Sequence, residues 1–466
     1  MSAWQSFRDA FGPLRILWQS YSGYYCIGLD HLCPISIVTS LDYGLDYPLI
    51  ESETGIRMLG VERSAARRPK PGFTVAEGIV PALEAEIIES VRERGPGPWA
   101  FVCPYPCDSL PALASRLGHR SVSLPARLCH WLDDKRNFFA GLAERGLPRL
   151  PGEWLSLSGN GYAEVRRRMG ARFVAQKARG LSGSGTRFVR SESEYREAAG
   201  ALGDEPVWIT PEQEGVSLNL NAIAMDGGVV VGSPNIQLVG FTQLGVRPGM
   251  YCGNDFTSAA ELDGRLLEDV RRQAEQVGLW LRELGYRGLF GLDFVVDPGA
   301  GRACAVDLNP RWQGSTALGA QAEALAGRLP LPAAEIAWKL GVVGEEEILK
   351  RSDEFFRPLR ASQMALQAGG SGWAAPQGEI KPGVCQASDS AEWLRPGVRL
   401  DELRNSGEAL ITGAVLPRGW PIEPCRFLLR VYSERPVIDP EKRELLPWAN
   451  GFVRTVYEKL RLSPAG

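Results

Sequence analysis

The sequence predicts a multidomain protein that combines an α/β domain with α+β domains. Its 466 residues exceed the length that one hydrophobic core usually supports, so two or three domains are expected. Short apolar runs alternate with helical stretches over residues 1–132, which is typical of a three-layer α/β domain. Residues 346–466 are rich in Gly and Pro and contain short strand-like runs, which indicates a small β-rich C-terminal extension.

The composition excludes several classes of protein. Hydrophobic residues make up 44% of the chain, which is enough for globular packing, and the net charge of −3 provides no basic field for nucleic acid. No apolar run reaches the length of a membrane span, and residues 1–15 lack the apolar core of a signal peptide. We therefore expect a cytoplasmic protein without a membrane partner, whose nine cysteines are reduced core thiols.

Apolar periodicity places the main elements along the chain. In the N-terminal region, strands are predicted at residues 14–18, 34–39 and 99–103, and helices at 76–94 and 109–117. A strongly periodic helix is predicted at 262–284, and strands of the C-terminal region at 360–366, 408–415 and 427–432. The N-terminal region contains no phosphate-binding fingerprint, so the candidate functional residues lie between these two regions.

The first candidate residue is Lys135. Residues 132–148 predict an amphipathic helix with an acidic start, Asp133 and Asp134, and a glycine stop before Pro148. Lys135 lies in the first turn of this helix. A lysine in such a position is most often solvated, so its function depends on the segments that follow.

The second candidate is a glycine-rich loop after a lysine. An apolar strand that begins at Phe173 ends in Lys177, a loop of small residues follows, and a second strand begins at Arg187. Glycines let backbone N–H groups surround an anion, and the lysine adds a point charge. Because a strand and not a helix follows the loop, it is neither a Walker loop nor a dinucleotide fingerprint. An ordinary hairpin loop is the alternative.

The third candidate is a predicted β-hairpin at residues 288–311, in which two apolar runs flank a Pro-Gly turn. Alternate side chains of a strand share a face, so Asp307, Asn309 and Arg311 project together and Asp293 can join them from the partner strand. Two carboxylates and an amide oxygen suit Mg²⁺, and a guanidinium can stabilise a phosphoryl group in transit. A hairpin end capped by Asp and Asn is the alternative.

The order of these three segments resembles the ATP-grasp superfamily, which includes D-alanine–D-alanine ligase, biotin carboxylase and amino-acid or peptide ligases. The separations, 42 residues from Lys135 to Lys177 and 14 from Asp293 to Asp307, are similar to those of the family. The resemblance implies a core of two α+β subdomains. This ATP-grasp domain is assigned to residues 133–345, between an N-terminal domain (1–132) and the C-terminal extension (346–466).

The resemblance also implies roles for individual residues. Lys135 and Lys177 would contact the ATP phosphates, and Lys177 and Arg311 would be catalytic. The flap over the phosphates would comprise Ser182, Gly183, Ser184, Gly185 and Thr186. The metal ligands would be Asp293, Asp307 and Asn309, which would hold Mg²⁺, or Mn²⁺ as the alternative ion. Many relatives have Glu at these acidic positions; Asp keeps the charge and shortens the reach.

Residues 207–218 resemble the strand–hinge–strand that clamps adenine and ribose in the family. Ile209 would then lie at the adenine, Glu212 at the ribose and Glu214 close behind, although turn surface is the alternative for both glutamates. Many relatives begin this hinge with Glu, where this chain has Thr210 and Pro211. For the substrate, the resemblance favours three residues between the hinge and the hairpin, with solvent-exposed loop as the alternative: Gln237, Arg247 and Tyr251.

The implied activity is an ATP-dependent ligase. The γ-phosphoryl group would pass to a carboxylate, and an amine would attack the resulting acyl-phosphate to give an amide or peptide bond, ADP and phosphate. The motifs are most similar to those of stand-alone peptide or amino-acid ligases of secondary metabolism. The partners would be a small-molecule carboxylate and an amine, and a homodimer is common in the family. A nucleotide-binding protein without ligase turnover and a small-molecule kinase are the alternatives.

Overall fold

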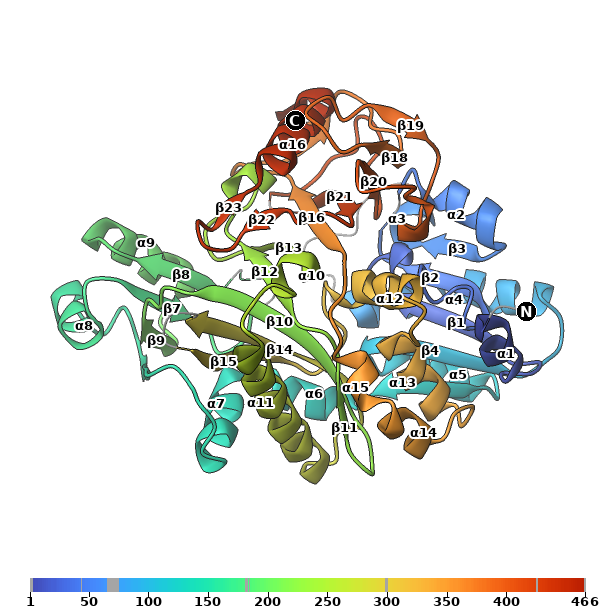
Figure 1. The fold of residues 1–466 in the computed structure, drawn as a ribbon, viewed down its shortest axis with the longest axis horizontal. Coiled ribbons are helices and arrows are strands. Elements are labelled where there is room, and N and C mark those ends of the chain that lie inside the picture. The colour runs from blue at the N-terminus through green and yellow to red at the C-terminus, as the bar shows by residue number, and fades with distance from the viewer. Residues whose placement is uncertain are drawn as a thin grey trace.

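The computed structural model describes residues 3–42, 44–64, 75–180, 183, 185–297, 301–424 and 426–464. Three parts of the chain surround a central region: an N-terminal sheet on the right of Figure 1, a small lobe on the left, and a C-terminal part at the top. A long antiparallel sheet passes between them. The mixed architecture confirms the predicted fold class.

The N-terminal part contains a parallel sheet with the strand order β3-β2-β1-β4-β5. Its strands are β1 (Arg15–Ser20), β2 (Ile35–Ser40), β3 (Arg57–Gly60), β4 (Trp99–Pro106) and β5 (Arg120–Leu124). Parallel neighbours need crossover connections, which include α2 (Tyr47–Thr54), α4 (Val75–Glu93) and α5 (Ser109–Arg116). Side chains of this sheet share one hydrophobic cluster with α12 (Thr316–Leu325) and α13 (Leu331–Lys339).

The lobe on the left of Figure 1 is a four-stranded antiparallel sheet with the order β6-β9-β7-β8. Its elements are β6 (Glu153–Leu155), α8 (Tyr162–Met169), β7 (Phe173–Gln176), β8 (Thr186–Val189), α9 (Glu192–Leu202) and β9 (Val207–Pro211). The two helices and the sheet enclose a separate small core. The predicted glycine-rich loop connects β7 and β8, which pair from Gln176 opposite Thr186 onwards.

The central sheet has the order β15-β14-β10-β12-β13-β16-β21-β20-β18-β19, with β11 paired to β10. Its first strands are β10 (Val216–Ala224), β11 (Val229–Val231), β12 (Asn235–Val239), β13 (Tyr251–Asp255), β14 (Gly288–Asp297) and β15 (Arg302–Asn309). Helix α11 (Gly264–Glu283) packs on these strands because its apolar residues recur at helical spacing, as in Leu266, Val270 and Val277. The sequence predicted this helix and the β14–β15 hairpin.

The C-terminal strands continue the central sheet. They are β16 (Ser362–Gln367), β18 (Gly383–Gln386), β19 (Trp393–Arg395), β20 (Glu408–Thr412) and β21 (Phe427–Ser433). Strand β16 pairs with β13, Met364 opposite Gly253, so residues after 346 share a sheet with residues before it. Helix α16 (Pro447–Leu460) packs on this part. Two small ladders complete it: β17 (Ala374–Pro376) with β24 (Leu462–Pro464), and β22 (Ile438–Asp439) with β23 (Glu444–Leu445).

Short helices complete the described chain. They are α1 (Ala3–Asp9), α3 (Val61–Ser64), α6 (Ala126–Leu132), α7 (Lys135–Glu144), α10 (Phe256–Ala259), α14 (Glu345–Lys350) and α15 (Ser352–Phe355). The last two fall on the charged segment after residue 345, where the sequence predicts a domain boundary. Helix α7 is the predicted lysine helix.

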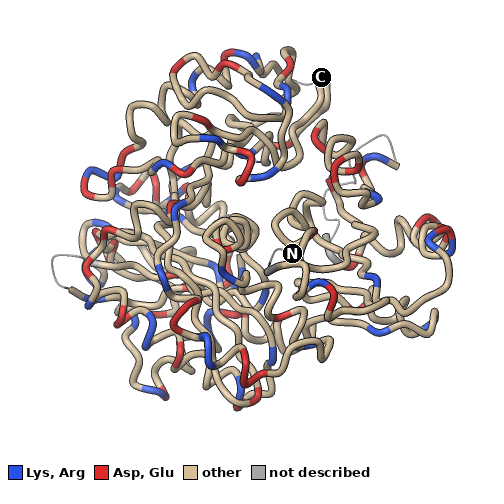
Figure 2. Tube along the Cα trace, turned by 45° about the vertical axis from the view of Figure 1, so that its right-hand side comes forward, with Lys and Arg blue, Asp and Glu red and all other residues tan. Residues whose placement is uncertain are grey.

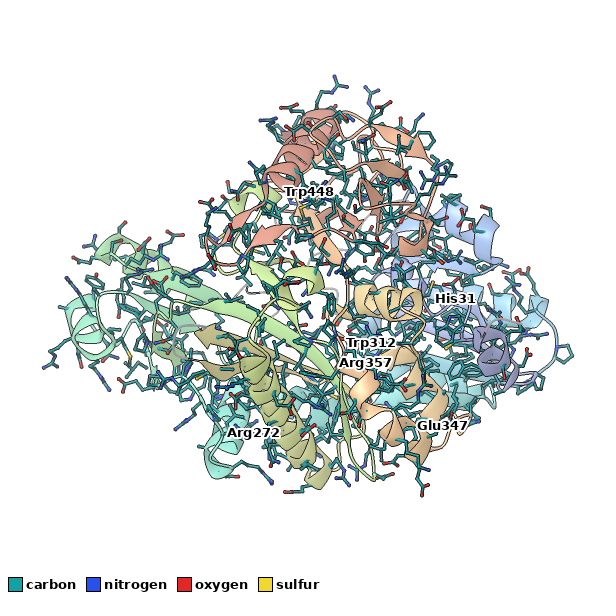
Figure 3. All side chains as sticks on the ribbon, in the orientation of Figure 1. His31, Arg272, Trp312, Glu347, Arg357 and Trp448 are labelled. Atoms are coloured by element: carbon teal, nitrogen blue, oxygen red, sulfur yellow. The ribbon has the colours of Figure 1, made fainter. Side chains whose placement is uncertain are left out.

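Buried contacts join the N-terminal part to the C-terminal part and to the segment that follows β15. Asp46, at the start of α2, is fully buried and accepts hydrogen bonds from the backbone N–H groups of Gly413 (2.9 Å), Ala414 (3.1 Å) and Val415 (3.1 Å). Trp312, which is labelled in Figure 3, packs on Trp18 of β1 with ring centroids 4.8 Å apart, and both side chains are buried. These contacts link the N-terminal part to two of the regions that surround the candidate site.

The two signs of charge are interspersed along the trace (Figure 2). In the described ranges, no helix combines the length and the apolar character that a membrane crossing requires.

Candidate functional site

A cavity of about 800 Å³ lies between the N-terminal part, the lobe and the central sheet. Most of the residues proposed from the sequence line it: Lys135, Lys177, Gly183, Gly185, Thr186, Glu212, Gln237, Tyr251, Asp293, Asp307, Asn309 and Arg311. Ile209, Glu214 and Arg247 are not brought to its wall. Ser182 and Ser184 lie outside the described residues. Segments that are far apart in the sequence therefore converge on one site.

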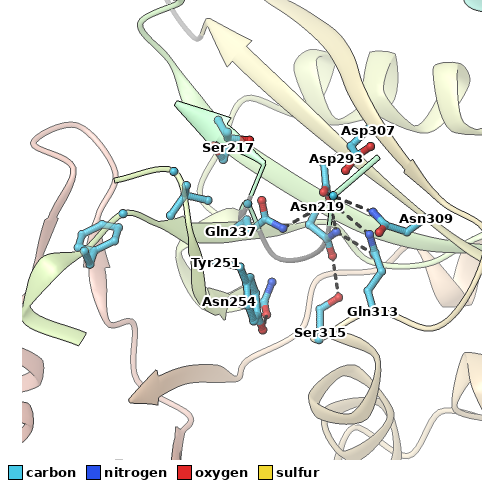
Figure 4. A pocket seen from close by; sticks show the side chains of 18 of the residues that line it. Ser217, Asn219, Gln237, Tyr251, Asn254, Asp293, Asp307, Asn309, Gln313 and Ser315 are labelled. Carbon is cyan, nitrogen blue, oxygen red and sulfur yellow. Dashed lines mark hydrogen bonds between the residues drawn. The ribbon is translucent and has the colours of Figure 1, made fainter. Parts of the chain in front are cut away.

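The β14–β15 hairpin carries the acidic centre of this site (Figure 4). Asp293 and Asp307 lie directly opposite each other in the antiparallel register, on one face of the sheet. The Asn309 amide donates to Asp293 over 3.5 Å, and the Arg311 guanidinium donates to Asn309 Oδ1 at 2.8 Å. The predicted cluster of two carboxylates, an amide and a guanidinium is thus present.

Lys135 lies against this cluster. It is the first residue of α7, whose start is capped by the Asp134 side chain. The Lys135 side chain is only 7% exposed, and its Nζ lies 2.5 Å from Asp307 Oδ1. The backbone N–H of Lys135 donates to the carbonyl of Ala178 at 2.9 Å, which links the helix to the segment after Lys177. A cation from a distant helix therefore faces the predicted metal ligands.

The proximity of Asp293 and Asp307 creates a local negative charge that a divalent cation would neutralise. Burial, followed by the neighbouring charge of Asp307, raises the pKa of Asp293 to about 6, although a hydrogen bond from Asn219 opposes the shift. Within the part of the chain that the structure describes, no three His, Cys, Asp or Glu side chains gather as a metal site. Two carboxylates and one amide oxygen fit Mg²⁺, which keeps water and phosphate oxygens as its remaining ligands.

Polar side chains surround Asp293, and of these the sequence analysis named only Gln237. Asn219 of β10 donates to Asp293 at 2.5 Å and to Gln313 Oε1 at 2.8 Å, and Gln313 also donates to Asp293 at 3.2 Å. Ser315 donates to Asn219 at 2.6 Å, and Gln237 approaches Asp293 at 3.5 Å (Figure 4). Because these donors are neutral, they orient the carboxylate without cancelling its charge.

Two sequence signals could have revealed this network. In β10, Ser217, Asn219 and Asn221 alternate with apolar residues, so the strand presents a polar face to the cavity side of the sheet. In β14, a Cβ atom on Gly291 would lie 1.8 Å from Cδ of Gln313, so only glycine allows that amide to approach.

The polar face extends across the sheet beyond Gln237. Asn254 of β13, which is opposite Gln237, donates to Asn235 at 2.6 Å, and Gln363 of β16 donates to Asn254 at 2.6 Å. The hydroxyl of Tyr251 donates to Asn254 Oδ1 at 2.5 Å. A continuous row of hydrogen-bonded side chains therefore leads from the acidic pair toward the C-terminal strands.

The loop after β7 offers free positive charge. Lys177 is exposed, lines the cavity and has no carboxylate within 4.0 Å among the described residues. Its backbone N–H donates to the carbonyl of Gly185 at 3.0 Å. Gly183 has a φ of +77°, and a Cβ there would lie 2.0 Å from the Gly249 carbonyl oxygen, so this turn depends on glycine. An anion in the cavity would be able to contact the Lys177 ammonium and the backbone of this turn at the same time.

The hinge differs in detail from the sequence-based interpretation. Glu212 lines the cavity, but both its oxygens accept hydrogen bonds from Arg172 (2.9 and 2.9 Å) and Arg190 (3.0 and 2.6 Å). Burial alone would raise the pKa of Glu212, but the two guanidinium groups outweigh it and lower the pKa to about 2. Ile209 is a core residue of the lobe, and Glu214 is exposed and pairs with Arg172. The cavity wall here begins at Thr210.

The three proposed substrate residues separate in the structure. Gln237 and Tyr251 face the cavity from β12 and β13. Arg247 is exposed in the loop between these strands and does not line the cavity. The opposite wall, which the sequence did not predict, comes from the N-terminal part through Tyr21, Tyr25 and Tyr105, and from the C-terminal strands through residues such as Arg430.

No family model and no curated protein matches the chain. Solved structures do match. An L-amino acid ligase from Bacillus licheniformis superposes with a TM-score of 0.57 at 12% identity, over 97% of this chain and 98% of the ligase. An ATP complex of carboxyaminoimidazole ribonucleotide synthase from Aspergillus clavatus gives 0.57 at 12% identity, over 95% of this chain and 98% of the synthase.

A third structure holds both a nucleotide and its metal. The biotin carboxylase domain of Hydrogenobacter thermophilus 2-oxoglutarate carboxylase, solved with MgADP and bicarbonate, superposes with a TM-score of 0.55 at 14% identity, over 91% of this chain and 86% of that chain. At these identities the likeness concerns the fold. The chain shares the fold of these enzymes, and that fold is the one that its resemblance to the ATP-grasp superfamily implied.

Proposed function

We propose that the protein is an ATP-dependent carboxylate–amine ligase. The observation that supports this most strongly is the convergence of the acidic pair Asp293–Asp307 with Asn309, Arg311 and Lys135 in one cavity. Lys177 and the glycine-rich loop line the same cavity from the lobe. Positioning and neutralisation of charge are what phosphoryl transfer to a carboxylate requires from a protein.

In this proposal, Asp293, Asp307 and Asn309 hold Mg²⁺, with Mn²⁺ as the alternative ion, and the bound ion supplies charge neutralisation at the ATP phosphates. Lys177 and the backbone of Gly183, Gly185 and Thr186 would contact the phosphates from the lobe, and Lys135 would contact them from α7. Arg311 stabilises the acyl-phosphate. Ser182 and Ser184 belong to the same proposed flap.

The finer parts of the proposal concern substrates and context. The product is an amide or peptide formed from a small-molecule carboxylic acid and an amine, and Gln237 and Tyr251 contact the substrate. The whole-length likeness to an L-amino acid ligase supports this substrate class. A role in secondary metabolism, a cytoplasmic location, a homodimer and the division at residues 132 and 345 belong to the same proposal.

Product analysis tests the proposed function. The protein is incubated with MgATP and pools of amino acids and small carboxylic acids, and ADP release and product masses are measured. ADP together with an amide supports the ligase. ADP together with a stable phosphorylated product would replace it with a kinase. Stabilisation by MgATP without any ADP would replace it with a nucleotide-binding protein that lacks turnover.

A further inference from the structure

Arg430 of β21 is a buried cation in the wall of the cavity. It is only 5% exposed, and no carboxylate lies within 4.0 Å of it in the described ranges. Its NH1 donates to the carbonyl of Gly413 and its NH2 to the hydroxyl of Tyr25, both at 3.0 Å. Its guanidinium also lies over the rings of Tyr25 (5.1 Å) and Phe427 (4.8 Å). Charge at this depth normally has an anionic partner.

The contacts of Arg430 leave room for such a partner. A guanidinium has five N–H donors, and the two hydrogen bonds to Gly413 and Tyr25 use two of them. Aromatic contacts cover its faces and leave donors at its edge. Asp42 lines the same cavity, but it accepts from the backbone N–H of Gly23 (3.1 Å) and from the hydroxyl of Tyr47 instead.

Arg430 belongs to the same face of the central sheet as the acidic pair. Gln363 lies opposite both Asn254 and Tyr432, and Arg430 is two residues from Tyr432 on β21. The row of amides that starts at Asp293 therefore ends beside Arg430. Five steps between neighbouring strands separate β14 from β21 in the sheet. Arg430 and Arg311 therefore belong to different parts of the wall of one cavity.

We propose that Arg430 binds the carboxylate of the amine substrate and so holds its amine toward the β14–β15 hairpin. This inference rests on the proposed ligase function, because it assigns one of the two substrates of that reaction. A guanidinium binds a carboxylate through two parallel hydrogen bonds. A single buried positive charge matches the charge of one carboxylate, whereas a phosphate group carries more negative charge at neutral pH. The substrate class is therefore an amino acid or a peptide with a free C-terminus.

Ligand-dependent unfolding of the MgADP-loaded protein tests this inference. The probes are the twenty free amino acids and the corresponding amino-acid amides, which keep the amine but lack the carboxylate. The variants are Arg430→Gln, Arg430→Lys, which keeps the charge without the two-pronged geometry, and Arg454→Gln as a control. Arg454 is an exposed arginine on α16.

We expect at least one free amino acid to raise the melting temperature of the wild type, while its amide does not. Arg430→Gln should lower the affinity for this amino acid at least about tenfold, and Arg430→Lys should lower it less. Arg454→Gln should bind the amino acid with the affinity of the wild type. The inference fails if amides stabilise equally, if no free amino acid stabilises the wild type, or if inorganic phosphate is the ligand that depends on Arg430. Should Arg430→Gln not fold, wild-type affinity in Arg430→Lys overturns it.

Two further results separate this inference from the proposed function. Arg430→Gln should bind MgADP as the wild type does in calorimetry, because the nucleotide site is formed by other residues. If Arg430→Gln forms the amide with an unchanged KM for the amine, the inference about Arg430 is wrong but the proposed ligase function stands. If an amino acid binds in a way that depends on Arg430 but no acid tested gives an amide, the proposed ligase function is wrong and the assignment of Arg430 stands.

Discussion

The β14–β15 hairpin and the β7–β8 loop face the same cavity but are built differently. The acidic residues of the hairpin are held by neutral amides and by the buried Lys135. In the loop, Lys177 is exposed and has no carboxylate near it among the described residues. The carboxylates of the hairpin are held in place by protein side chains in the absence of a ligand. The Lys177 ammonium, in contrast, has no ion-pair partner among the described residues.

This difference indicates how the two regions divide the work. Two carboxylates that repel each other must be held rigidly by neighbouring side chains, because metal binding depends on the distance between their oxygen atoms. A lysine that must release its phosphate after each turnover benefits from a mobile side chain and from having only weak contacts in the nucleotide-free protein. Substitutions in the hairpin should therefore abolish chemistry, while substitutions in the loop should mainly weaken nucleotide binding.

The largest effect is expected for Asp307→Asn. Loss of one of the two carboxylates should lower ADP formation at least about 1,000-fold, because the metal would lose a charged ligand and Lys135 its ion-pair partner. The unfolding midpoint should stay close to that of the wild type, since the asparagine oxygen can still accept a hydrogen bond from Lys135 and the charge repulsion with Asp293 is removed. Asp226→Asn, at an exposed carboxylate that pairs with Arg287, is the matched control. Wild-type turnover in Asp307→Asn would contradict the metal assignment.

The next effect concerns pH and Asp293. Its pKa is about 6 in the folded protein, mainly because of burial, against about 3.9 in the unfolded chain. Between these values the folded state binds the extra proton, so this group should make the metal-free protein less stable as pH rises from about 4 to 6, by roughly 2–3 kcal/mol. Mg²⁺ competes with that proton, and its stabilising effect should therefore increase over the same range.

Urea unfolding between pH 4.5 and 7, with EDTA or with excess Mg²⁺, measures both trends. Asp293→Asn should remove most of the pH dependence and the response to Mg²⁺, whereas Asp226→Asn should retain both. Equal slopes in the wild type and in Asp293→Asn would show that another group titrates.

The sequence predicted the parts of the site whose signals are local. The hairpin follows from period-two alternation around a Pro-Gly turn, and Asp293, Asp307 and Asn309 come together within one such unit. The N-terminal strands β1, β2 and β4 and the helices α4 and α5 were predicted from their periodicity, whereas β3 and β5 were not. Where one supersecondary unit carries the function, a single sequence is sufficient to locate it.

Residues whose position depends on pairing between distant segments were missed. Arg430 reaches the cavity only because β21 pairs with β16 and β16 with β13, an order that no local pattern specifies. The sequence also did not predict that Arg172 and Arg190 converge on Glu212 from other parts of the lobe. Long-range strand order decides both cases, and it is set by the total packing of the sheets rather than by nearby residues.

A moderate effect is expected for Lys177→Ala. Loss of one exposed charged contact should weaken MgATP binding about tenfold and leave the unfolding free energy unchanged, because Lys177 has no carboxylate partner in the described ranges to lose. Lys350→Ala, at an exposed lysine on α14, is the control. Unchanged affinity in calorimetry would show that the β7–β8 loop does not grip phosphate.

The smallest effect is expected for Glu212→Gln, which distinguishes a structural role from a nucleotide contact. Because two half-exposed arginines hold the carboxylate, its neutralisation should cost about 1 kcal/mol of unfolding free energy. Its pKa of about 2 in the folded protein, against about 4.3 unfolded, means that this stabilisation is present above pH 4 and is lost as pH falls toward 2. Acid unfolding of Glu212→Gln should lack that component.

ATP affinity decides between the two roles of Glu212. If the carboxylate holds β9 to its neighbours through Arg172 and Arg190, calorimetry should show less than about a threefold change in MgATP affinity, which is well under 1 kcal/mol. A loss of tenfold or more, with little change in stability, would instead place Glu212 at the ribose. In that case the arginines must release an oxygen when nucleotide binds, and the lobe would resemble the hairpin in holding its acidic side chain ready for a ligand.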